Sequence, residues 1–126
     1  MMKLLYIITG LLLLVSCSES TRDVEDPVFC TEELRPGLEV VVKNIETDSI
    51  IKNGISVNAI DSTGSELLEF IESAYFGAFE KEGTYTLEIT GADFEPFSSE
   101  TPIIVESDIC HVITEVREVF LVPVGE

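Results

Sequence analysis

The sequence predicts an all-β protein in which two sheets pack as a β-sandwich. Its apolar residues recur in short segments at regular spacing, turn-forming residues separate the segments, and no long stretch has the period of a helix. The clearest segment is residues 84–90, where Tyr85, Leu87 and Ile89 alternate with Thr and Glu. Such alternation is typical of a strand with one face against a core. Residues 28–126 are long enough for one such domain and not for two.

The first half of the domain supplies two further strands. Residues 38–43 and 55–59 both alternate apolar and polar side chains. The pair Asn53-Gly54 precedes the second of them and is typical of a tight turn. The polar residues 61–64 follow it and predict the next turn.

The middle of the domain is less regular. Residues 66–71 fit either a short helix capped by Ser65 or a continuously apolar strand, and we favour a strand or an irregular segment. Residues 75–79 are predicted to be extended, with Gly77 allowing either a close approach of another segment or a kink. Residues 80–83 predict a turn.

The last third combines a loop with two strands. Residues 91–100 are predicted to be a loop in which Phe94 and Phe97 either close the end of the core or stand exposed. Residues 103–105 follow Pro102 and suit a short strand at a sheet edge. Residues 110–122 are apolar on both faces, which predicts a strand buried on both sides or one that changes phase at a bulge.

Residues 1–16 have the parts of a secretory signal peptide. Lys3 supplies the positive charge, residues 4–15 are mostly apolar, and Ser16 is the small residue before a cut. A membrane-spanning helix needs about 20 apolar residues, so this run is too short to remain as an anchor. An acidic stretch, residues 17–27, follows and is predicted to be a flexible tether.

The end of the apolar run resembles the lipobox of bacterial lipoproteins, with Leu14, Val15 and Ser16 before Cys17. The resemblance implies cleavage before Cys17, a diacylglyceryl group on its sulfur and acylation of its new amino group. Two or more acyl chains would hold the protein stably at a membrane. The alternative is an ordinary signal peptide that leaves a free thiol. Acidic residues in the tether also resemble the stretch that some Gram-negative lipoproteins carry for display on the outer face, and a solvated linker is the alternative.

Charge and cysteine content limit the partners. The chain has a formal charge of −17, and removal of residues 1–16 takes away only one Lys, so contacts with nucleic acid phosphates or anionic lipids are not expected. Lipidation of Cys17 would leave Cys30 and Cys110, which in an exported domain predicts a disulfide. Neither this pair nor the adjacent His111 has the ligand spacing of a zinc site, so no metal is expected there.

One segment resembles a known family. Residues 83–89, Gly-Thr-Tyr-Thr-Leu-Glu-Ile, with 91–94 after them, are similar to a repeated motif of carboxypeptidase regulatory-like domains. The strand at 38–43, the turn at 61–64 and the run at 110–121 fit the same module, as found in small bacterial lipoproteins. The resemblance implies a seven-stranded, transthyretin-like (prealbumin-like) β-sandwich.

The residues give little sign of catalysis. His111 is the only His, no Ser lies in a nucleophile-elbow pattern, and pairs of carboxylates are expected by chance in so acidic a chain. We therefore expect a structural role for His111, no catalytic residue, no cofactor and no enzyme activity. Residues 61–66 could supply oxygen ligands to calcium, but they lack the EF-hand spacing and a charged turn is the simpler interpretation.

The sequence thus predicts an outer-membrane lipoprotein, on the periplasmic face or the cell surface, that acts as a non-catalytic binding or scaffolding module. An accessory for envelope assembly or stability, acting through protein partners, is the alternative. A glycan-binding module is another alternative, with Phe94 and Phe97 as the candidate ligand-binding residues. A bare sheet edge near residues 102–105 would instead favour addition of a strand from a partner.

Overall fold

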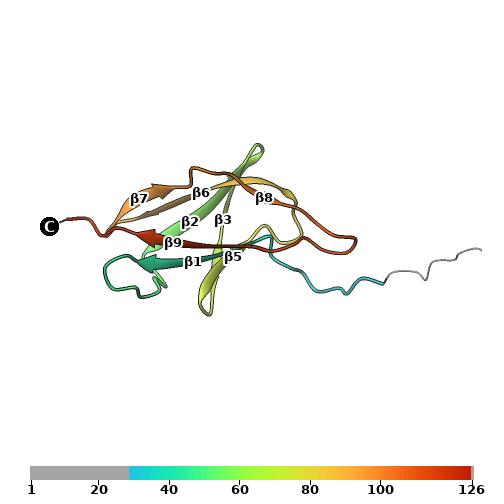
Figure 1. The fold of residues 1–126 in the computed structure, drawn as a ribbon, viewed down its shortest axis with the longest axis horizontal. Coiled ribbons are helices and arrows are strands. Elements are labelled where there is room, and N and C mark those ends of the chain that lie inside the picture. The colour runs from blue at the N-terminus through green and yellow to red at the C-terminus, as the bar shows by residue number, and fades with distance from the viewer. Residues whose placement is uncertain (1–28, 126) are drawn as a thin grey trace, which may run out of the picture.

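The computed structural model describes residues 29–125, which form nine strands in two sheets (Figure 1). One sheet has the order β4-β5-β1-β9, and the other has the order β3-β2-β6-β7 with β8 also beside β6. The strands are β1 (Leu38–Asn44), β2 (Ile55–Asp61), β3 (Gly64–Leu67), β4 (Glu69–Ile71), β5 (Ala74–Gly77), β6 (Gly83–Gly91), β7 (Phe94–Ser98), β8 (Ile103–Val105) and β9 (Glu115–Leu121). The all-β sandwich is confirmed, but the prediction of seven strands is wrong for the described chain, which has nine. Within that range no helix is long and apolar enough to cross a membrane.

The core lies between the two sheets and is built from the alternating residues of three strands. On β1, Leu38, Val40 and Val42 are fully buried, and so are Val57 and Ala59 on β2. The inward face of β6 adds Tyr85 and two aliphatic residues. Because side chains of a strand alternate between its faces, these three segments were the easiest to recognise in the sequence.

Residues 64–71 are extended, and the chain changes sheets in the middle of them. β3 pairs with β2 in one sheet and β4 pairs with β5 in the other. Between them Leu68 is buried, and its N–H donates to the Val57 carbonyl at 2.8 Å. The favoured extended conformation is therefore confirmed. The apolar residues looked continuous because they serve two different sheets.

The predicted close approach at Gly77 is also confirmed. A Cβ atom there would lie 2.8 Å from Leu68 Cγ, so only glycine lets the two segments pack at this distance. At Gly37, a Cβ atom would lie 2.8 Å from the Ala78 carbonyl oxygen. The first contact packs Leu68 against the end of β5, and the second brings the beginning of β1 against the residue that follows β5.

Two predictions about the last third are wrong. Residues 94–98 form strand β7, paired with β6 by a hairpin, rather than part of a loop. In addition, β9 begins at Glu115 instead of Cys110, and it is neither buried on both sides nor bulged. Val119 and Leu121 face the core while Val116 and Phe120 are exposed, so one face of this apolar strand lies toward solvent.

Candidate functional site

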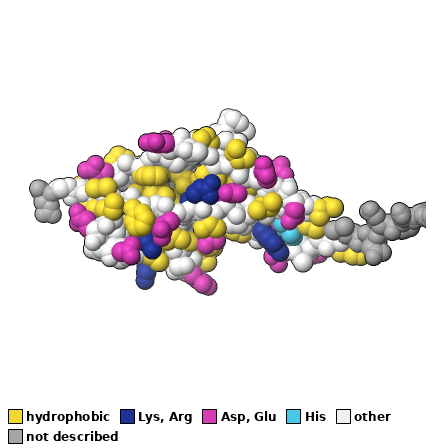
Figure 2. Space-filling view, in the orientation of Figure 1, with side chains coloured by type: hydrophobic (Ala, Val, Ile, Leu, Met, Phe, Trp, Pro, Cys, Tyr) yellow, Lys and Arg dark blue, Asp and Glu magenta, His cyan; other side chains and the backbone are white. Residues whose placement is uncertain are grey.

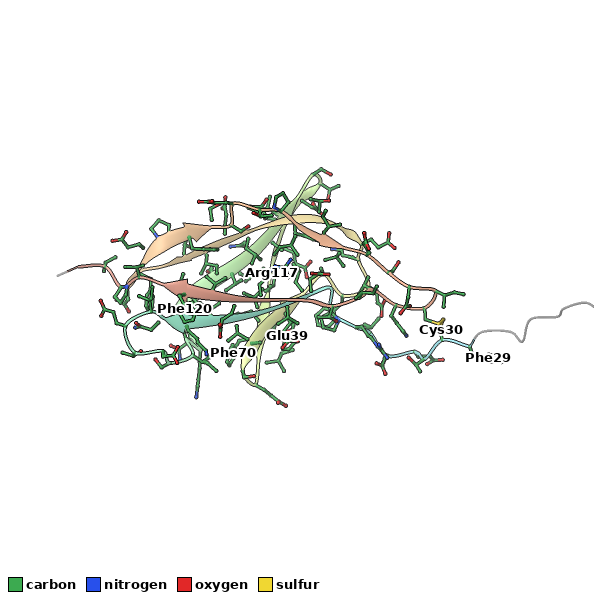
Figure 3. The ribbon with its side chains drawn as sticks, viewed as in Figure 1. Phe29, Cys30, Glu39, Phe70, Arg117 and Phe120 are labelled. Atoms are coloured by element: carbon green, nitrogen blue, oxygen red, sulfur yellow. A yellow bond between two sulfur atoms is a disulfide. The ribbon has the colours of Figure 1, made fainter. Side chains whose placement is uncertain are left out.

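A disulfide joins Cys30 to Cys110, as the sequence predicts, with their Cα atoms 5.2 Å apart. It ties the segment before β1 to the loop between β8 and β9. Both lie at the end of the molecule where the described chain begins, opposite the C-terminus (Figures 1 and 3). Cys17 lies outside the described residues, so its lipidation stays a prediction.

Next to the disulfide, His111 is held between two side chains from distant parts of the chain. Its Nδ1 lies 2.6 Å from Glu80 Oε2, and its Nε2 lies 3.0 Å from Thr31 Oγ1. The imidazole is only 9% exposed. A structural role for His111 was expected from the sequence, but its two partners were not. They are 80 and 31 residues away from it, and no local motif marks them.

The Glu80 carboxylate connects three segments of the chain. Besides His111, it accepts the N–H of Arg35 at 2.9 Å and the N–H of Val112 at 3.2 Å. These donors, the Arg35 N–H above all, lower the pKa of Glu80 against the opposing effect of burial. Asp108 acts similarly inside the β8–β9 loop, where the N–H groups of His111 and Cys110 lower its pKa. We call Thr31, Glu80, Asp108 and His111 the polar clasp.

The polar clasp has the order hydroxyl, imidazole, carboxylate that is found in catalytic triads, but its surroundings differ from theirs. A triad also needs N–H donors aimed at a developing oxyanion. Here the nearby N–H groups of Cys110, His111 and Val112 are already bound to carboxylates. The geometry thus suits fastening of the N-terminal segment better than turnover of a substrate.

The clasp predicts a specific pH dependence. The pKa of folded Glu80 lies below its ordinary value of 4.5, so protonation of this group favours the unfolded chain. Its contribution is complete above pH 4.5 and is lost as pH falls through the folded pKa. We expect Glu80→Gln to be less stable than wild type at pH 7, with the difference vanishing in acid. Urea unfolding of both proteins from pH 7 to pH 3 measures it, and a difference independent of pH would contradict it.

The turn at residues 61–66 offers little to a calcium ion. Asp61 Oδ1 accepts the N–H groups of Thr63 and Gly64 and the Thr63 hydroxyl, all within 3.0 Å. The Lys81 ammonium lies 3.5 Å from Glu66 Oε1 and already supplies a positive charge there. Among residues 29–125, no three His, Cys, Asp or Glu side chains are grouped so that they could hold a metal ion. The simpler interpretation, a charged hairpin turn, fits this geometry.

Phe94 and Phe97, the candidate ligand-binding residues, lie on β7. Both rings are half-buried and pack against the hydrophobic core, and Phe97 is paired with Ile89 of β6. Of the two placements left open by the sequence, the structure has the one that closes the core. Their role in ligand binding remains a prediction.

The double variant Phe94→Ala/Phe97→Ala separates packing from binding. Replacing one fully buried Phe by Ala lowers the free energy of unfolding by about 3–5 kcal/mol. Replacing two half-buried rings should therefore lower it by roughly that much in total. Urea denaturation should therefore show a clearly lower free energy of unfolding. An unchanged free energy of unfolding together with reduced glycan binding would instead support the ligand-binding role.

Apolar side chains are exposed on the open side of the sandwich, between β9 and β7–β8, in the view of Figure 2. A hollow of about 220 Å³ lies there, lined in part by Leu87, Phe97, Ile103, Arg117 and Val119. β9 pairs with β1, and no strand pairs with its other side among the described residues. This free side ends just beyond β9, where the Val122 carbonyl accepts the Glu95 N–H of β7 at 2.8 Å. The edge expected near residues 102–105 does form at β8, but β8 is three residues long and β9 has seven.

Comparison with known protein families, with curated proteins and with solved structures finds no match to this chain. The candidate sites therefore depend on geometry alone. The polar clasp fastens one end of the molecule. On the open side of the sandwich, β9 is the longest of the three strands β7, β8 and β9.

Proposed function

We propose that this protein is an exported, lipid-anchored binding module of the cell envelope that acts without catalysis. The observation that carries the proposal is the fastening of the N-terminal segment at one end of the sandwich by the disulfide and the clasp. A tether from Cys17 would join the molecule at this end and leave the rest of the sandwich free to meet a partner. The signal-like residues 1–16 and the lipobox-like residues before Cys17 add support from the sequence.

The variant Cys17→Ala tests the anchor. The wild-type protein should fractionate with membranes after a high-salt wash, while the variant should be released in soluble form because it lacks the acyl chains. Ser18→Ala is the matched control and should behave as wild type. If Cys17→Ala stays with the membranes, lipid is not the anchor and the proposal fails.

Between the two partner classes, the geometry favours a protein over a glycan. The exposed peptide edge of β9 is a surface to which another chain can add as a strand. The half-buried Phe94 and Phe97 present less of their ring faces than a glycan platform needs. An accessory role in envelope assembly is therefore the second candidate function.

For the fold, we propose a relationship to transthyretin-like sandwiches of the carboxypeptidase regulatory-like type. Support comes from the motif at residues 83–89, which forms most of β6 in a two-sheet sandwich. An experimental structure tests this proposal. Sheet connections different from those of a carboxypeptidase regulatory-like domain would overturn it.

A further inference from the structure

The hydrogen-bond ladder determines which peptide groups of β9 face outward. The Glu115 N–H donates to the Gly37 carbonyl at 2.8 Å, and the Leu121 carbonyl accepts the Ile45 N–H at 2.9 Å. In a parallel pair, alternate residues direct both peptide groups to the same neighbour. The four odd-numbered residues from 115 to 121 therefore bond β1. The N–H and C=O groups of Val116, Glu118 and Phe120 point to the free side.

An added strand would find apolar contacts on both of its faces. Val116 and Phe120 are 55% and 40% exposed on the outer face of the sheet. On the inner side lies the 220 Å³ hollow, whose apolar lining includes Leu87, Ile103 and Val119. Since side chains of an added strand alternate between these faces, its inward residues could fill the hollow. Arg117 and Phe120 mark this edge in Figure 3.

The charges around the edge select the partner. Glu118 stands at its centre, where it is ion-paired with Lys43 of β1 at 3.0 Å, and Glu100 and Arg117 both line the hollow. The local charges are therefore nearly balanced, but the whole chain has a formal charge of −17. This negative field favours a basic partner strand over an acidic one, and a Lys or Arg opposite Glu118 would share its carboxylate with Lys43.

We propose that the free edge of β9 binds an extended, basic segment of a partner protein, which adds as a fifth strand next to β9. The proposal rests on the binding function proposed above and names the partner of that module. Arg117 now covers part of the edge, since its Nη1 donates to the Val116 carbonyl at 2.9 Å. This contact is replaced by the partner's N–H when the strand adds.

A second copy of this chain fits the edge poorly. The antiparallel pairing that uses all three outward residues is centred on Glu118 and places it opposite the same residue of the copy. Two chains of charge −17 also repel each other. Self-association is thus an outcome that the experiment must detect rather than the expected one.

The experiment uses the lipidated protein in zwitterionic detergent and the peptide acetyl-KVKVKVKVK-amide as probe. Amide hydrogen exchange is followed by NMR with and without the peptide. The expected result is new protection of the Val116, Glu118 and Phe120 N–H groups. The control is the same peptide N-methylated at its five central residues, which keeps the charge but removes the ladder donors in either strand direction, so it should give no such protection.

Two variants separate strand addition from simple attraction of charges. Glu118→Pro removes an N–H that points away from β1, so the sandwich should remain intact while peptide affinity falls about tenfold or more. Glu118→Gln keeps the peptide edge and removes the carboxylate together with its ion pair to Lys43, so the loss should be on the order of two- to threefold. Circular dichroism and thermal unfolding check that both variants are folded.

Each outcome decides the proposal. Equal binding of both peptides, or protection outside β9, would show that charge alone attracts the probe and would overturn it. Protection of the same N–H groups without any peptide, with a dimer in sedimentation, would identify a second copy as the occupant and also overturn it. Because hydrogen exchange is measured on the wild-type protein, the proposal can be tested even if the Glu118→Pro variant does not fold. Membrane release of Cys17→Ala is a separate readout, so failure of the anchor and failure of the edge are distinguishable.

Discussion

The double variant Cys30→Ser/Cys110→Ser should unfold at a much lower temperature than the wild-type protein. The disulfide closes a loop with a sequence separation of 80 residues, and the chain-entropy estimate for such a loop is about 4 kcal/mol. For a domain of this size, 1 kcal/mol corresponds to about 4–8 °C, so the midpoint should fall by on the order of 15 °C or more. Scanning calorimetry measures this difference directly.

Two controls make this prediction specific. Reduction of the wild-type disulfide should reproduce the effect, and Cys17→Ser should leave the midpoint unchanged. The polar clasp crosses the same junction, so residues 29–36 should also lose protection in hydrogen exchange when the disulfide is absent. A fall in stability of less than about 1 kcal/mol would mean that the reduced, unfolded chain remains as constrained as the bridged one.

Replacing Tyr85 by Ala should have an effect of similar size through the core. The ring is 2% exposed, and its hydroxyl donates to the Lys81 carbonyl at 3.1 Å. Loss of a buried aromatic side chain costs about 3–5 kcal/mol, because contacts are lost and a cavity is left behind. Equilibrium unfolding in urea gives the free energy of unfolding for the comparison.

Two further variants divide this loss into its parts. Tyr85→Phe removes only the hydroxyl and should cost about 1 kcal/mol. Phe120→Ala removes an aromatic ring from the exposed face of β9 and should cost clearly less than Tyr85→Ala. If the Phe120 and Tyr85 variants were equally unstable, Phe120 would have to be covered in solution, which would itself point to an occupied edge.

The strands that could be predicted from the sequence are those with one buried face and one polar face. β6 has this pattern along nearly its whole length, and β1 and β2 have it except at Val41 and Ile60, which are apolar residues on the outer faces. β7 was missed because it contains Pro96 and Glu95, which are rare in central strands and acceptable at an edge. The sequence predicts that the last strand begins at Cys110 rather than at Glu115, because apolar residues continue on both sides of its true start. Only one face of the strand is buried.

Little of the candidate site could be predicted, for a different physical reason. The disulfide followed from the number of cysteines and the expected compartment. The clasp, in contrast, depends on Thr31, Glu80 and His111 meeting across three loops, and no spacing in the sequence records such a meeting. The free edge of β9 depends on which strands are neighbours, and this is a property of the topology.

The parallel pairing of β1 with β9 sets the order in which the fold can be completed as the chain emerges. Leu38 is paired with Glu115, 77 residues later, so this half of one sheet cannot form until nearly the whole chain is present. Contacts between such distant residues form slowly, because a long loop must close first. Until β9 arrives, the edge of β1 and the apolar core next to it stay open to other chains. The incomplete chain should therefore depend on chaperones until its last strand docks.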